Sequence, residues 1–290
     1  MPANAPGHGS LNMKTATTIA SMRAWPRNIA HPVVLVPTMG ALHEGHAALI
    51  RTARKMAGRH GAVVVSIFVN PIQFGPKEDL ASYPRPFRRD LAVCRHAGAD
   101  AVFAPAAGEM YCADRSVFTD ESSLSQALCG RSRPGHFRGV CTVVAKLFLI
   151  VQPTHALFGE KDWQQLAILR RMVRDLNFPV DVVGHPTVRE ADGLALSSRN
   201  AYLTPQERAL APGIHAALSA ASRLKSPGAI VKAATRGISS ISGARIDYIE
   251  AVDAETLEPL LQRRRPGRLA AAIFLGRARL IDNVPLPAIT

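Results

Sequence analysis

A pair of histidines in a glycine-containing segment is the first candidate for chemistry. The segment Pro37–His46 (PTMGALHEGH) follows the apolar run Val33–Val36 and opens a pattern with helical spacing. His43 and His46 stand three residues apart, so on a first helical turn they face the same side. Free N–H groups at a helix start favour phosphate, and two imidazoles there can donate hydrogen bonds to its oxygens. The segment predicts phosphoryl or nucleotidyl transfer, whereas an isolated histidine pair could equally cap or pack the helix.

Neutral amides form the second candidate group. Asn70 and Gln73 lie in the segment Phe68–Gly75 (FVNPIQFG), at the end of the apolar run Val63–Val69. Amides can recognise hydroxyls and carboxylates without the desolvation cost of a charged partner. Taken alone, the segment is more simply interpreted as an Asn-Pro turn.

One carboxylate is a candidate metal ligand. Asp90 lies beyond the segment Asp79–Arg85 (DLASYPR). Mg²⁺ on nucleotide phosphates typically uses one or two carboxylates plus water, which Asp90 could supply. A solvated surface aspartate is the alternative.

The segment Phe158–Gln165 (FGEKDWQQ) carries a lysine and ends on a predicted helix. Lys161 is a point charge suited to phosphate, and Gln165 falls on that helix. Asp162 is interpreted as a ligand contact or, with at least equal weight, as the N-cap of the helix.

A small polar segment, Leu196–Asn200 (LSSRN), lies just beyond Asp192 and Gly193. Two hydroxyls and an arginine can make a mobile phosphate clamp, and small polar residues at a domain junction suit a loop that closes over a nucleotide. A plain linker to the next helix is the alternative.

Five short apolar runs must position these segments. The runs are Val33–Val36, Val63–Val69, Ala101–Phe103, His155–Phe158 and Val180–Val183. They are continuous and end at turn residues, which is typical of strands buried on both faces of a parallel sheet. Helical patterns lie between them, at His46–Met56, Phe87–His96, Leu124–Leu128 and Trp163–Leu176. The fold class is therefore α/β, a Rossmann-like doubly wound parallel sheet, with its chemical segments at strand ends.

A second, smaller α+β domain is expected after about residue 187. Thr204–Glu207 (TPQE) predicts a helix start with a capping box, followed by a long alanine-rich helix to about Lys225. The remaining expected elements are a helix at Ala229–Ile238, a strand at Ile246–Val252 and a last strand near Leu269–Phe274. We expect a flexible extension at residues 1–12, a Rossmann-like domain at 13–186 and a C-terminal lid domain at 187–290.

Composition bounds the class of protein. The chain has 290 residues, 47% of them hydrophobic, and a net charge of +13 that is dispersed along its length. The apolar run Val140–Val151, interrupted by Lys146, is too short to span a membrane and predicts a buried helix or strand. The basic cluster Gln262–Arg268 is interpreted as a solvated loop, and the four cysteines as free thiols of a cytoplasmic protein.

In their order along the chain, these segments resemble the pantothenate synthetase family. Three more segments contribute: RPGHFRGV (Arg133–Val140), PTVREADGLALSSRN (Pro186–Asn200) and AYLT. Within the wider nucleotidyltransferase superfamily, the HxGH element resembles the HIGH signature and LSSRN resembles the KMSKS loop. The resemblance covers roughly residues 13–290 and is densest from 33 to 204.

The resemblance implies that pantoate and β-alanine are condensed with ATP as a substrate and Mg²⁺ as a cofactor. The reaction would pass through a pantoyl adenylate and release AMP and pyrophosphate. The resemblance also implies a homodimer joined through the N-terminal domain, whereas the cytoplasm is expected because the first residues do not resemble a secretion signal. Nucleic acid and membrane are not expected as partners.

The resemblance assigns roles to particular residues. The implied catalytic residues are His46 as proton donor, His43, Lys161 and Arg199. The implied ligand contacts are Gln73 and Gln165 for pantoate, Gln73 for β-alanine and Asp90 for Mg²⁺. The implied ATP contacts are Met39, Gly40, Ala41, Leu42, His43, Glu44, Gly45, His46, Gly159, Glu160, Lys161, Asp162, Val188, Leu196, Ser197, Ser198 and Arg199. Leu196 replaces a methionine found in many members, a change of little volume.

Two alternatives remain open. Another HxGH nucleotidyltransferase would act on a small phosphate ester and leave a stable nucleotide conjugate instead of AMP. A nucleic-acid-binding module would show steeply salt-dependent RNA binding. The dispersed charge speaks against the second alternative.

Overall fold

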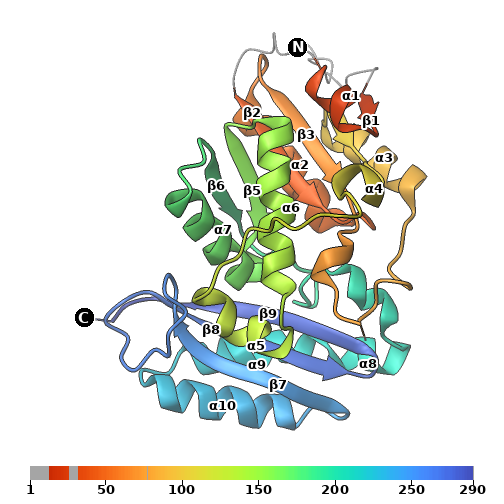
Figure 1. Cartoon of the computed structure of the whole chain (residues 1–290). Coiled ribbons are helices and arrows are strands. Elements are labelled where there is room, and N and C mark those ends of the chain that lie inside the picture. The colour runs from red at the N-terminus through yellow and green to blue at the C-terminus, as the bar shows by residue number, and fades with distance from the viewer. Residues whose placement is uncertain (1–12, 26–31, 77, 290) are drawn as a thin grey trace, which may run out of the picture.

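Six parallel strands form one sheet in the order β1-β4-β3-β2-β5-β6 (Figure 1). The computed structural model describes residues 13–25, 32–76 and 78–289, so the extension predicted at 1–12 lies outside the described residues. The strands are β1 (Lys14–Ala16), β2 (Val33–Thr38), β3 (Ala62–Ile67), β4 (Ala101–Phe103), β5 (His155–Gly159) and β6 (Asp181–His185). The five predicted strands are confirmed. The sixth, β1, was not predicted, because three residues with one buried side chain give too short a pattern.

The order of the strands creates a crevice. Successive strands run from β2 through β3 to β4 in one direction, whereas β5 and β6 lie on the other side of β2. In open parallel sheets ligands bind where the order reverses, outside the carboxyl ends of the strands. The segments that follow β2 and β5 therefore flank the crevice.

Helices cover both faces of this sheet. Helices α2 (Glu44–Ala57) and α3 (Phe87–Ala97) pack on one face, and α1 (Ile19–Arg23), α6 (His136–Val151) and α7 (Trp163–Asp175) pack on the other. Val34, Leu35 and Val36 of β2 are fully buried between the layers, which explains the continuous apolar runs. The run Val140–Val151, left open between helix and strand, belongs to α6.

Short elements complete this half of the molecule. They are α4 (Ala107–Met110), α5 (Leu128–Ser132) and the 3-10 turns η1 (Pro71–Gln73), η2 (Leu124–Gln126), η3 (Glu160–Asp162) and η4 (Ser198–Tyr202). The single helix predicted at Leu124–Leu128 is wrong. The turn η2 ends at Gln126, and Leu128, with φ of 44°, is the first residue of α5. A residue with positive φ interrupts a right-handed helix, so η2 and α5 stay separate. In the part of the chain that the structure describes, no helix is long and apolar enough to cross a membrane.

The C-terminal part is a separate antiparallel sheet, drawn beneath the parallel sheet in Figure 1. Its strands are β7 (Ala244–Asp253), β8 (Gly267–Leu275) and β9 (Ala278–Leu286), and its helices are α8 (Pro205–Leu210), α9 (Pro212–Ser222) and α10 (Pro227–Ser239). Alternate residues such as Ile249 and Ala271 pack on the helices, whereas Tyr248 and Ala270 pack against the body of the parallel sheet. The antiparallel sheet thus packs with one face against the half of the molecule that contains the parallel sheet.

Three expectations for the C-terminal part need correction. The predicted long helix to about Lys225 is interrupted at Ala211, because Pro212 starts a new helix and lacks the N–H that would continue α8. The strand near Leu269–Phe274 is not the last, since β9 pairs with it through a tight turn at Gly276. The basic cluster is a mostly exposed turn over residues 262–266, as predicted, but its last residue, Arg268, lies in β8. The capping box of Thr204 and Glu207 is confirmed.

Candidate active site

Two adjoining cavities lie at the carboxyl edge of the parallel sheet. The inner pocket has a volume of about 230 Å³ and lies against the ends of β2, β3 and β5. The outer cleft, of about 690 Å³, lies between the first half and strands β7–β9. Five residues line both cavities: Lys161, Asp162, Gln165, Ser197 and Arg199. The two hollows therefore form one continuous candidate site.

Most of the predicted site residues meet in the inner pocket. Its lining includes Met39, His43, Gly45, His46, Gln73, Gly159, Lys161, Asp162, Gln165, Val188, Leu196, Ser197, Ser198 and Arg199. They come from four distant segments, so the structure confirms that these segments converge on a single place. Their individual roles stay predictions.

Six predicted residues do not line either cavity. Gly40, Ala41 and Leu42 form the turn behind the pocket, with φ of 82° at Gly40 and 51° at Ala41. Glu44 points outward and pairs with Arg51, and Glu160 pairs with Arg268. The sixth is Asp90.

Asp90 is built into the protein interior. Its side chain is 1% exposed, and its two oxygens accept the N–H groups of Ala41, at 3.0 Å, and Leu42, at 2.8 Å. Burial raises the pKa of this carboxyl despite the two hydrogen bonds. Among the described residues there is no group of three or more His, Cys, Asp or Glu that could hold a metal ion. Asp90 therefore fits a role in holding the glycine turn, and the solvated aspartate of the alternative interpretation is wrong.

The histidine pair is neutral and fixed in orientation. His43 is the N-cap of α2, and its Nδ1 accepts the N–H of Gly45 at 3.2 Å. His46 Nδ1 accepts the N–H of His43 at 3.3 Å, and the two ring centroids are 4.1 Å apart. Because each Nδ1 is an acceptor, each neutral ring carries its proton on Nε2.

Burial keeps both rings uncharged. It lowers the pKa of His43 to about 4 and that of His46 to about 3, and the nearby Lys161 ammonium acts in the same direction. The cap interpretation and the catalytic interpretation of the pair are thus compatible. The backbone uses one nitrogen of each ring and leaves the other as a hydrogen-bond donor at the pocket.

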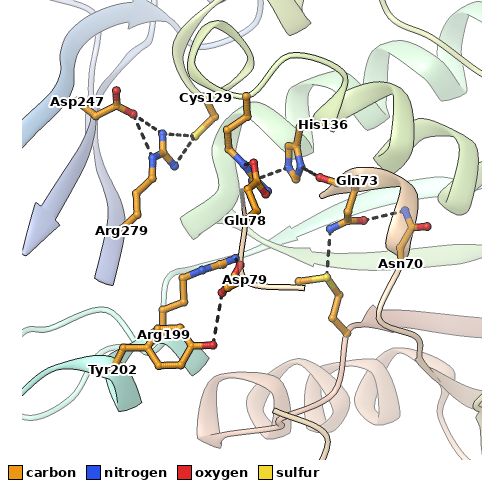
Figure 2. Close-up of polar contacts among 12 residues, drawn as sticks. Asn70, Gln73, Glu78, Asp79, Cys129, His136, Arg199, Tyr202, Asp247 and Arg279 are labelled. Carbon is orange, nitrogen blue, oxygen red and sulfur yellow. Dashed lines mark hydrogen bonds and ion pairs between the residues drawn. The ribbon is translucent and has the colours of Figure 1, made fainter. Parts of the chain in front are cut away.

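Gln73 is held by its neighbours within the same pocket. Its Oε1 accepts from Asn70 Nδ2 at 3.0 Å, and its Nε2 lies 3.1 Å from the sulfur of Met39 (Figure 2). Asn70 and Gln73 are 1% and 8% exposed, so these contacts are shielded from water. The Asn-Pro turn is present as η1, and it carries the amides to the pocket.

The two adjacent glutamines of α7 have different environments. Gln164 is buried and holds the start of α5, accepting from the Cys129 N–H at 2.9 Å and donating to the carbonyl of Ala127 at 2.7 Å. Gln165 lines both cavities. Gln164 also lines the outer cleft, but of the two only Gln165, the residue selected from the sequence, lines the inner pocket as well.

Strand β9 and its neighbours hold the lysine-bearing segment. Asn283 Nδ2 donates to the carbonyls of Glu160, at 2.8 Å, and Lys161, at 3.0 Å. Arg268 pairs with Glu160 at 2.9 Å and stacks over the Trp163 ring. Asp162 occupies the N-cap position of α7 but makes no capping hydrogen bond, and Lys161 Nζ lies 3.3 Å from its carboxylate. The second sheet thus positions a loop of the first.

Two arginines at the site are paired with one acidic loop. Asp79 accepts from Arg199 at 3.0 Å and from the Tyr202 hydroxyl at 3.4 Å (Figure 2). Glu78 forms an ion pair with Arg133, with 2.9 Å between Arg133 Nε and a carboxylate oxygen. Burial alone would raise the Glu78 pKa, but the Arg133 guanidinium holds that pKa below its usual value.

Sequence reasoning missed part of the outer cleft. Arg133 lines it and donates to His136 Nε2 at 3.0 Å, and His136 Nδ1 in turn donates to the Gln73 carbonyl at 2.9 Å. Burial and Arg133 lower the pKa of His136 to about 4. Both residues lie in RPGHFRGV, a segment to which the sequence assigned no role. Arg279, bonded to Asp247 at 2.7 Å, gave no sequence signal at all.

The outer cleft is mixed in charge with a slight basic excess. Its lining cations are Arg133, Lys161, Arg199, Arg245, Arg277 and Arg279. Its lining acids are Glu78, Asp79, Asp162, Asp247 and Asp282. Because most of these acids already contact a cation, an anionic ligand would compete with carboxylates for the arginines.

The sheet order and the cleft at its reversal define a Rossmann-like α/β protein with a small-molecule site. A family model described as pantoate-beta-alanine ligase matches residues 14–285. The chain therefore belongs to the pantoate–β-alanine ligase family, and it is a ligase. The family predicted from the motifs is confirmed.

Named relatives agree with this assignment. The chain is 54% identical over 282 residues to a pantothenate synthetase of Akkermansia muciniphila, covering 94% of this chain and 100% of the relative. The crystal structure of a pantothenate synthetase from Thermus thermophilus is similar with a TM-score of 0.90 and 48% identity, covering 95% of this chain and 100% of that one. A Francisella tularensis pantoate-beta-alanine ligase complexed with beta-gamma ATP and beta-alanine has a TM-score of 0.78 and 32% identity, with 94% and 97% covered.

Proposed function

We propose that this chain condenses (R)-pantoate with β-alanine through a pantoyl adenylate, consuming ATP and releasing AMP and pyrophosphate. The observation that carries the proposal is the convergence of two neutral histidines, two glutamines and two cations on one pocket at the sheet edge. Family membership supports the overall reaction. The Francisella tularensis relative, crystallised with beta-gamma ATP and beta-alanine, supports two of the three substrates.

The first step joins the acid to the nucleotide. A carboxylate oxygen of pantoate attacks the α-phosphorus of ATP, the bond from that phosphorus to the bridging oxygen breaks, and pyrophosphate leaves. Negative charge builds on the phosphate oxygens, where hydrogen-bond donors stabilise it. The Nε2–H groups of His43 and His46 are such donors, and Lys161 and Arg199 add charge.

Neutral imidazoles suit this step. A neutral donor stabilises the developing charge without exchanging a proton with the α-phosphate, and its burial costs less than that of a cation. His46, the predicted proton donor, would therefore act mainly by donating a hydrogen bond from Nε2. Its fixed orientation means that little rearrangement accompanies the reaction.

The second step consumes the adenylate. The amine nitrogen of β-alanine attacks the acyl carbon, the carbon–oxygen bond to the phosphate breaks, AMP leaves and the proton of the nitrogen passes to solvent. The intermediate must be kept from water until the amine arrives. Ser197, Ser198 and Arg199 lie on the segment between the two sheets, so this segment is the proposed lid.

Asp90, the predicted Mg²⁺ residue, accepts one backbone N–H at each carboxylate oxygen and lines neither cavity. Mg²⁺ remains an expected companion of ATP, since it binds nucleotide phosphates through few protein ligands and several waters. No step above depends on it. A homodimer joined through the parallel-sheet half is proposed from the family resemblance, and a cytoplasmic location from the sequence itself.

An assay for AMP tests the proposal. AMP formation should require pantoate, β-alanine and ATP together, whereas pantoate alone should support exchange of pyrophosphate into ATP. Exchange without β-alanine is the signature of an adenylate. A stable nucleotide conjugate with a phosphate ester, and no AMP, would instead identify another HxGH nucleotidyltransferase.

A further inference from the structure

The turn that carries Gln73 is clamped by helix α6. The backbone carbonyl of Gln73 accepts from His136 at 2.9 Å, and the carbonyl of Gly139 accepts from Asn70 at 3.0 Å. Gly139 packs so closely on the turn that a Cβ there would lie 2.6 Å from the Cα of Gln73. The backbone position of Gln73 is therefore determined from outside the pocket.

A chain of hydrogen bonds also determines which way the Gln73 amide faces. A carbonyl can only accept, so Gly139 requires Asn70 to turn its Nδ2 toward it. The other Nδ2 proton goes to Gln73 Oε1, and Asn70 Oδ1 accepts the Tyr111 hydroxyl at 2.8 Å. With its oxygen occupied, Gln73 turns its Nε2 toward Met39 and the pocket.

We propose that Tyr111 is a positioning residue that fixes the polarity of the Gln73 amide. Tyr111 does not line the inner pocket; it lines a hollow on another side, with Pro71 and Phe118. Its hydroxyl reaches Asn70 from behind and supplies the donor that holds Asn70 Oδ1 in place. Tyr111 thus acts on the bound acid only through Asn70 and Gln73.

The polarity matters because the two ends of an amide have opposite roles. With Nε2 facing the pocket, Gln73 offers N–H donors, which match the carboxylate or hydroxyl oxygens of a hydroxy acid. After a flip, the same side chain would present an acceptor oxygen and would repel a carboxylate. Without the Tyr111 hydroxyl, the buried Asn70 oxygen lacks its donor, so only the Gly139 carbonyl still holds the Asn70 amide, and the orientation of the Gln73 amide is less firmly fixed. The identity of the acid rests on the proposed function; the hydrogen-bond chain does not.

Tyr111→Phe removes the hydroxyl and keeps the ring. We expect the KM for pantoate to rise about tenfold, as for one lost buried hydrogen bond, while the KM for ATP stays within about twofold. Arg115→Ala is the matched control, because the Arg115 guanidinium lies over the same ring at 5.5 Å but does not bond the hydroxyl. It should leave both constants unchanged. Equal rises in both constants for Tyr111→Phe, or no rise in either, would overturn the proposal.

A measurement without substrate separates this inference from the proposed function. In ¹⁵N-labelled unliganded enzyme, the side-chain NH₂ signals of Gln73 are identified by their loss in Gln73→Glu. We expect these signals to shift or broaden in Tyr111→Phe and to stay in place in Arg115→Ala. Unchanged signals in Tyr111→Phe would sink the inference even in an active enzyme. If the wild-type chain makes no AMP from pantoate, the proposed function fails while the signals still test the chain of bonds.

Discussion

The inner wall, made of the residues that line the inner pocket, and the outer wall, made of those that line the outer cleft, hold their polar groups in different ways. On the inner wall, His43, His46 and Gln73 are neutral and bonded to backbone or buried amides. On the outer wall, Arg133 and Arg199 are charged and paired with the carboxylates of Glu78 and Asp79, and Arg199 also reaches the inner pocket. The inner groups need not move to bind a ligand, whereas the arginines must exchange a carboxylate for it. The inner wall thus suits the chemical step, and the outer wall suits the binding and release of an anionic ligand.

Removal of an inner-wall donor should have the largest effect. His46→Ala deletes the Nε2–H and the Nδ1 that accepts from His43. We expect turnover to fall roughly 10²-fold or more, as for a lost charge-stabilising donor. Pantoate-dependent ATP–pyrophosphate exchange measures it. Exchange close to the wild-type rate would show that the inner wall is structural only.

A methyl group added behind the inner wall should have the next largest effect. In Gly139→Ala the new Cβ would approach the Ile72 carbonyl and the Gln73 Cα at 2.6 Å, so the turn must shift. We expect kcat/KM for pantoate to fall about tenfold, with a loss of about 1–3 kcal/mol in the free energy of unfolding. Steady-state kinetics and urea unfolding measure the two quantities.

The matched control is Gly108→Ala, because a Cβ at Gly108 would meet no atom within 4 Å. It should leave both pantoate kinetics and stability close to wild type. If Gly139→Ala behaves in the same way, the inner wall is softer than its contacts indicate.

The ease with which each wall could be predicted from the sequence also differs. The inner wall rests on strand ends and a helix start, and the continuous apolar runs, the helical spacing and the glycines predicted those elements. The role of Asp90 was not predictable, because the bonds to Ala41 and Leu42 join groups 49 and 48 residues apart. Charge and motif give no information about such a contact.

The outer wall depends on pairings between the two sheets. Arg279 and Asn283 come from β9, a strand that was not predicted because Pro285 interrupts its pattern. Glu78 and Asp79 could not be matched to Arg133 and Arg199 without the fold, since single charged residues do not specify their partners. Long-range ion pairs are therefore the part of the site that the sequence conceals.

Freeing an outer-wall arginine from its carboxylate should improve the binding of ATP moderately, whereas the substitutions above impair the enzyme. Asp79→Asn removes the negative charge that pairs with Arg199 at 3.0 Å, so ATP need not displace a carboxylate. We expect the KM for ATP to fall about threefold, the size of a partly exposed ion pair. Asp192→Asn, which breaks a pair with Arg208 instead, is the control and should not change it. A rise in the KM for ATP would mean that the carboxylate helps binding.

The smallest expected change is in the protonation of the inner-wall histidines: neither ring should titrate near the ordinary histidine pKa. Because burial lowers the pKa of His46 to about 3 and that of His43 to about 4, both rings should stay neutral from about pH 8 to about pH 5.5. Their ¹⁵N signals, assigned by loss in His46→Gln and His43→Gln, should show a protonated Nε2 and should not move over this range. In the unfolded chain both rings bind protons below about pH 6.5, whereas in the folded chain they stay neutral. These rings should therefore make the free energy of unfolding decrease as the pH falls from about 6.5 toward about 4. A midpoint near the ordinary value of about 6.5 in either signal would place an imidazolium at the inner wall, and the contrast between neutral chemistry and charged capture would no longer hold.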